Sequence, residues 1–210
     1  MKKTILLFAM LLSVISLSAQ FSFGPKIGYT TSKLSADQSD ITSDLKNSFL
    51  YGAFVRLGSK VYLQPEINWY TSGSVFKSPS LGGGLSPIEQ EINLKNIQIP
   101  LYIGFKLADL KLMNIRAQAG PTATIIVDKT IDSKSGGGFI APIKEADISD
   151  LNWGFQFGAG IDVLMLTLDI QYYVGITKMI KEVEVPGITN PVKFDSRSQG
   201  FMVTLGWKIM

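Results

Sequence analysis

Residues 151–177 read LNWGFQFGAGIDVLMLTLDIQYYVGIT, and this stretch decides the fold. Large apolar side chains alternate with polar residues and glycine up to Val163, and the alternation resumes after Leu164 and Met165. A period of two is typical of a β-strand with one apolar face, because successive side chains point to opposite faces. The stretch therefore predicts two long antiparallel strands that are joined by a tight turn at Leu164–Met165.

The same alternation recurs along the chain. Six further segments show it, at residues 21–32, 49–57, 61–75, 92–107, 113–128 and 201–209. Only the segment 49–57 is ambiguous, since Phe54 falls with Arg56 on the otherwise polar face. The predicted strands are longer than the roughly 5–6 residues of globular strands, and they suit the roughly 9–11 residues that a tilted membrane strand needs.

The lengths of the connections alternate as well. Short turns are expected near 58–60, 108–112 and 164–165, and long loops near 33–48, 76–91, 129–150 and 178–197. Tight turns at one end and long loops at the other are typical of an outer-membrane β-barrel, whose strands must close because lipid cannot satisfy an open edge. The sequence predicts an all-β, eight-stranded antiparallel up-and-down transmembrane β-barrel with its long loops facing outward.

The start of the chain predicts export. Lys2 and Lys3 precede the apolar run 5–15, and small residues follow before Gln20. This is the pattern of a secretory signal peptide, which we assign to residues 1–19, leaving residues 20–210 as one barrel domain in the bacterial outer membrane. Two of the net three positive charges belong to Lys2 and Lys3, so nothing in the charge balance calls for nucleic acid.

Composition argues against an enzyme. The chain contains no Cys and no His, which removes thiolate catalysis, Ser-His and Cys-His pairs and the commonest metal ligand. Asp162 and Asp169 resemble a carboxylate pair for acid–base work, but a filled barrel offers a substrate no cleft. We expect no enzymatic activity, no cofactor and no metal.

The polar face of the strands is expected to fill the barrel, since eight strands enclose just enough space for side chains. The charged residues on this face form a predicted interior network: Lys26, Arg56, Glu66, Lys106, Arg116, Asp162, Asp169 and Lys208. Charges taken out of water must be paired, and strand adjacency suggests the pairs Arg116–Asp162 and Asp169–Lys208. The predicted interior is net positive, so any leak would favour anions.

The three tryptophans share the apolar face. Trp69, Trp153 and Trp207 are expected near strand ends, where they would form the aromatic girdle of a membrane barrel.

With its strands laid out, the chain resembles the PorT-like family of outer-membrane β-barrel proteins. The resemblance covers nearly all of the mature chain, and its residues occur in this order: Gly24 to Gly28, Pro65 to Tyr70, Ile97 to Leu101, Gly154 to Gly160 and Leu168 to Ile176. Two features depart from the family pattern: Gln171 stands where the family often has Arg, and the chain ends on Ile209-Met210 rather than on an aromatic residue. The resemblance implies an outer-membrane barrel of mostly unassigned role.

The favoured interpretation is a small, monomeric, non-enzymatic barrel in outer-membrane lipid. Its outward loops would contact a protein partner at the cell surface or serve a larger membrane complex. Two alternatives remain: a narrow, porin-like pore or carrier for small solutes, and a secreted lipocalin-like barrel that turns its apolar face inward around a hydrophobic ligand.

Overall fold

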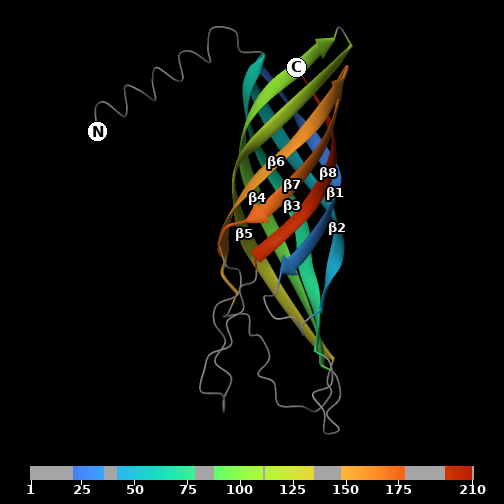
Figure 1. Ribbon diagram of the computed structural model, residues 1–210, viewed down its shortest axis with the longest axis vertical. Helices are drawn as coiled ribbons and strands as arrows, with labels where there is room; N and C mark the ends of the chain where they lie inside the picture. Colours follow the sequence, from blue (N-terminus) through green and yellow to red (C-terminus); the bar gives the residue numbers. More distant parts are fainter. Residues whose placement is uncertain are drawn as a thin grey trace, which may run out of the picture.

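The computed structural model describes residues 21–35, 42–78, 88–110, 112–134, 148–177 and 197–209. Eight strands make up the fold, in the order β1 (Phe21–Ser35), β2 (Thr42–Gly58), β3 (Val61–Ser78), β4 (Ile88–Leu110), β5 (Met113–Lys134), β6 (Leu151–Val163), β7 (Leu166–Gly175) and β8 (Arg197–Trp207). Each strand pairs with the next, and β8 pairs with β1 to close the barrel (Figure 1). The predicted eight-stranded antiparallel barrel is confirmed.

The register fixes the tilt of the strands. Following directly paired residues once around the barrel from Thr31 leads back to β1 at Phe21, a shift of ten residues. With a rise of about 3.3 Å per residue and strands about 4.8 Å apart, this shift inclines eight strands by about 40° to the barrel axis. A barrel of this size has an interior just wide enough for its own side chains.

Six strands extend beyond the residues that the apolar alternation predicts, and β2, β4 and β5 do so by the most. β2, β4 and β5 extend into segments that we expected to be loops: β4 begins at Ile88 and pairs with β3 up to Ser78, while β5 continues to Lys134. The ladder continues because backbone hydrogen bonds do not depend on apolar side chains. Alternation in the sequence marks the lipid-facing part of a strand, not its whole length.

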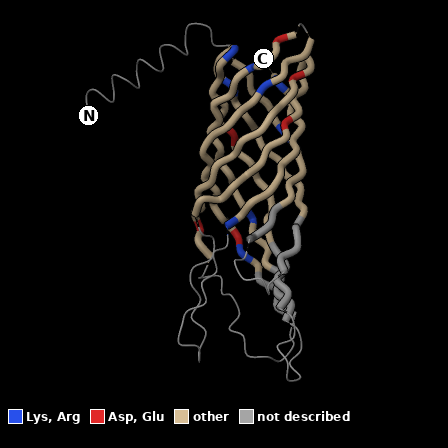
Figure 2. Tube along the Cα trace, viewed as in Figure 1, with Lys and Arg blue, Asp and Glu red and all other residues tan. Residues whose placement is uncertain are grey.

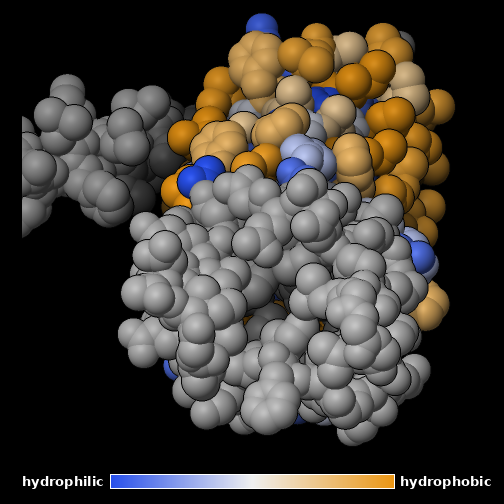
Figure 3. Space-filling model, turned by 60° about the horizontal axis from the view of Figure 1, so that its bottom comes forward, coloured by the Kyte–Doolittle hydropathy of each residue, from blue (hydrophilic) through white to orange (hydrophobic). Residues whose placement is uncertain are grey.

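The wall of the barrel is apolar on its outside. Side chains that point outward are large and exposed, among them Ile27, Tyr51, Ile103, Phe157, Ile170 and Val203. Figure 3 shows hydrophobic residues covering the side of the molecule beyond its loop end. The lipocalin-like alternative is therefore wrong, because it needs the apolar face to line a cavity.

The lipid-facing band has a visible outer limit. Lys95 on β4 and Asp128 on β5 face outward and form an ion pair of 2.6 Å, with both side chains largely exposed. Outward-facing apolar positions run from Leu166, at the start of β7, to Ile176, just past its end at Gly175. At about 3.3 Å per residue and about 40° of tilt they span about 25 Å, which is the height of the apolar band in outer-membrane barrels.

Short turns join the strands at the other end. Gly58 closes β2 with φ 121°, and Leu164 adopts φ 54° in the turn between β6 and β7. Positive φ suits glycine and strains a residue with a Cβ. Among the described residues, no helix has the length and apolar character to cross a membrane.

Candidate functional site

The barrel interior is the best-defined candidate site, and glycines create the space for it. A Cβ added at Gly160 would collide with Arg116 and Asp169, and one at Gly104 would collide with the Tyr62 ring. Large charged and aromatic side chains fit into the lumen because the strand positions next to them are glycines, which have no side chain.

Arg116 is the centre of the interior. It is fully buried, and its Nε donates to Asp162 Oδ1 at 3.0 Å while its Nη2 lies 2.6 Å from Asp169 Oδ1. Its Nη1 donates to Gln118 Oε1 at 3.0 Å. Arg56 reaches the same carboxylate from the opposite wall, with Nη1 2.6 Å from Asp162 Oδ2. Asp162 therefore bridges two arginines across the lumen, so each buried charge is compensated by an opposite one.

Glu66 anchors a second cluster. It accepts an ion-pair hydrogen bond from Lys26, and Gln64 Nε2 donates to its Oε1 at 2.7 Å. Asn68 Nδ2 donates to Oε2 at 3.3 Å. Arg56 Nε donates to Gln64 Oε1 at 2.6 Å and so joins the two clusters into one network.

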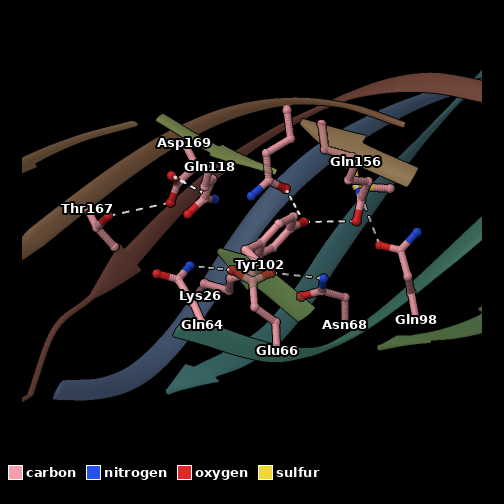
Figure 4. A network of polar contacts seen from close by, with 12 residues as sticks. Lys26, Gln64, Glu66, Asn68, Gln98, Tyr102, Gln118, Gln156, Thr167 and Asp169 are labelled. Atoms are coloured by element: carbon pink, nitrogen blue, oxygen red, sulfur yellow. Dashed lines mark hydrogen bonds and ion pairs between the residues drawn. The ribbon is translucent and has the colours of Figure 1, made fainter. Parts of the chain in front are cut away.

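A layer of amides and one tyrosine continues the network toward the loop end (Figure 4). Tyr102 is fully buried, and its hydroxyl donates to Gln156 Oε1 at 2.8 Å or to Gln171 Oε1 at 3.2 Å. Thr122 also donates to Gln156, at 2.9 Å, and Gln156 Nε2 donates to Gln98 Oε1 at 3.4 Å. Neutral hydrogen bonds here fill the cross-section without adding charge.

Apolar side chains close the lumen at the loop end, which the sequence did not predict. Leu50, Tyr70 and Met202 form a buried cluster. Nearer the loops, Ile92, Leu94, Ile126 and Ile148 are also buried. The alternation in the sequence places some of these residues on the face that points into the lumen. It does not show that they come together there as an apolar layer.

The predicted interior residues do not all reach the same depth. Six are buried, namely Lys26, Arg56, Glu66, Arg116, Asp162 and Asp169, which makes three cations and three anions. Lys106 and Lys208 are only half-buried. The expected positive interior is thus wrong for its deep part, which is neutral, and the surplus cations lie at the turn end.

Of the two predicted ion pairs, Arg116–Asp162 is present, whereas Asp169 pairs with Arg116 instead of Lys208. The Arg116 guanidinium can bind two carboxylates at once. Lys208 directly follows the last residue of β8 and so lies at the rim of the barrel, away from Asp169. Burial lowers the pKa of the Lys208 ammonium. Its position explains why strand adjacency alone assigned the wrong partner.

All three tryptophans lie on the outer wall, at different heights. Trp207 ends β8 on the turn side, and Trp153 lies near the loop-side end of β6. Trp69, in the middle of β3, stacks on Tyr51 with ring centroids 5.8 Å apart. Trp69 is not near the end of β3, because β3 continues beyond the apolar band, but it lies two residues from Thr71, which pairs with Lys95 at the outer limit of that band. The aromatic girdle itself stays a prediction.

The comparison with protein families agrees with this architecture. The family model described as outer membrane protein beta-barrel domain matches residues 16–181. The chain belongs to this family. The protein is therefore a small β-barrel of the bacterial outer membrane.

Solved structures resemble this outer-membrane barrel at low identity. The attachment invasion locus protein Ail of Yersinia pestis is 10% identical, with 90% of this chain and 99% of that chain covered and a TM-score of 0.43. The same protein is solved in complex with the heparin analogue sucrose octasulfate, with 92% and 100% covered and a TM-score of 0.43. OprG from Pseudomonas aeruginosa is 12% identical, with 91% and 97% covered and a TM-score of 0.44. None of the curated proteins matches the chain significantly.

Proposed function

We propose that the protein is a non-enzymatic barrel that acts through its outward end, by contacting a partner at the cell surface or within a larger membrane complex. The filled lumen carries this proposal. Charged side chains cross the barrel from wall to wall in the Arg56–Asp162–Arg116 bridge, and Leu50, Tyr70 and Met202 form an apolar layer nearer the loops. A lumen closed at two levels leaves little room for a substrate or for ion flow.

The outward end offers surface beyond the lipid band. Past the Lys95–Asp128 pair, β4 and β5 continue to pair as far as Glu89 and Lys134, and the long strands project from the barrel in Figure 1. The pairing of β5 with β6 ends at Ile125. Past that point Ile126 N–H donates to the Asp150 carbonyl at 2.8 Å, and exposed side chains such as Thr130 are the surface that a partner can contact.

Two finer assignments complete the proposal. Residues 1–19 act as a cleaved signal peptide, which delivers a monomeric barrel to the outer membrane. The barrel also belongs to the PorT-like group within its family, on the residues that carry that resemblance.

Site-specific photocrosslinking in intact cells tests the role of the outward end. A photoreactive residue at Thr130, exposed and beyond the lipid band, should give a protein adduct, and one at Ile170, on the lipid-facing wall, should not. If neither position gave a protein adduct, the surface-contact proposal would be wrong.

Conductance separates this proposal from a narrow pore or carrier. The purified barrel in planar bilayers should be almost silent, because the Asp162 bridge and the apolar layer obstruct its lumen. Stepwise currents from the wild-type barrel would favour the pore instead.

A further inference from the structure

The end of the lumen beside the short turns, here called the turn-side mouth, contains charged and polar groups that the interior network does not account for. Figure 2 shows several Lys and Arg, interspersed with Asp and Glu, toward the upper end, where the short turns lie. Charged groups within electrostatic reach of Lys208 are Arg56, Lys106, Arg116 and Asp162. Asp169 and the exposed Asp109 are the other carboxylates of this end. Among these described residues, four cations stand against three carboxylates, so an anion would find a favourable potential.

Two buried polar atoms at this end lack a partner among the described residues. Arg56 Nη2 is a charged donor on a side chain that is 3% exposed, and Asn114 Oδ1 is an acceptor. Asn114 lies directly across from Asp162 in the β5–β6 ladder, and Asp162 accepts a hydrogen bond from Arg56 Nη1, so both residues are neighbours of Asp162. An unsatisfied buried polar group costs about 1–3 kcal/mol, more for a charged one, which makes two orphans in one place informative.

The opposite character of the two atoms restricts the ligand. A guanidinium nitrogen needs an acceptor and prefers an anionic oxygen, whereas the amide oxygen needs a donor. A free phosphate that keeps one proton supplies both, and a phospholipid phosphodiester supplies both when a hydroxyl of its headgroup is the donor, as in phosphatidylglycerol. The negative charge of either offsets the cationic excess. Chloride supplies no donor, and water supplies no charge.

We propose that the turn-side mouth, between Arg56, Lys106, Asn114 and Lys208, binds a phosphate group from the periplasmic side. This phosphate is either a free ion or the headgroup of an inner-leaflet phospholipid that reaches over the rim. The site is independent of what the outward end contacts, so it can hold or fail without affecting that proposal.

Nuclear magnetic resonance on the isotopically labelled full barrel tests the site, in micelles of a maltoside detergent that carries no phosphate. Inorganic phosphate should shift the side-chain Nε–Hε resonance of Arg56 and the backbone amide of Lys208 in a saturable way. Phosphatidylglycerol added to the micelles forms the second arm. A response to either probe supports the site and shows whether the phosphate is a free ion or a lipid headgroup. A response to neither probe, or an equal response to chloride at matched ionic strength, would overturn the proposal.

Variants locate the response. Lys208→Gln should weaken phosphate binding about tenfold, since one charge-assisted contact is lost. Lys60→Gln is the matched control, because Lys60 lies at the same end with its ammonium over the outer face of Phe105, 5.6 Å from the ring centroid. Heat-dependent gel mobility verifies that both variants remain folded. Equal losses in the two variants would show that the rim attracts anions without a site.

Discussion

Asp162 is the residue on which the interior depends most. Its side chain is 1% exposed and holds both Arg56 and Arg116. Removing one partner from a buried ion pair costs about 3–5 kcal/mol, because the remaining charge is left buried without a partner. Asp162→Ala should therefore lower the unfolding midpoint of the barrel in detergent while it still inserts into membranes.

The exposed pair supplies the control for this change. Asp128→Ala also breaks an ion pair of 2.6 Å, but Lys95 is 67% exposed, so solvent screens the charge that remains. The change should cost at most about 1 kcal/mol. Equal midpoints for the Asp162 variant and the wild type, measured by gel mobility after heating, would show that the interior bridge does not stabilise the fold.

At the scale of elements, the turns make two predictions of opposite sign. Leu164 holds φ 54° in the β6–β7 turn, which costs a residue with a Cβ about 1–2 kcal/mol, whereas glycine adopts it freely. Leu164→Gly should raise the free energy of unfolding by about 0.5 kcal/mol once the greater entropy of unfolded glycine is counted. Gly58→Ala at φ 121° should lower it by more than 1 kcal/mol, because its Cβ would also meet the β3 backbone. Urea unfolding in lipid vesicles measures both, and shifts of the same sign would contradict this account.

Particular elements show how far the sequence predicts the structure. Alternation identified all eight strands, and the outward face of each except the ambiguous segment 49–57, because lipid on one side and packed polar groups on the other impose a period of two. It missed the outer ends of β2, β4 and β5, where water replaces lipid and no apolar face is required. It also assigned Asp169 to Lys208, since adjacency in the sheet does not reveal that the long Arg116 side chain reaches two carboxylates.

For the whole molecule, the position of the membrane follows from which exposed side chains face lipid and which face water. Ile170 is 54% exposed near the middle of β7, on the wall that faces lipid, and Thr130 is exposed on β5 beyond the Lys95–Asp128 pair. A cation on the lipid face near the midplane costs about 2–4 kcal/mol, but about 0–1 kcal/mol at the interface. Ile170→Arg should therefore reduce the stability of the folded barrel in vesicles strongly, and Thr130→Arg should leave it almost unchanged. In detergent micelles, which adapt to a polar group, the difference should shrink. If both variants were equally stable in vesicles, Ile170 would not lie in lipid, and the band between the turns and the Lys95–Asp128 pair would have to be placed elsewhere.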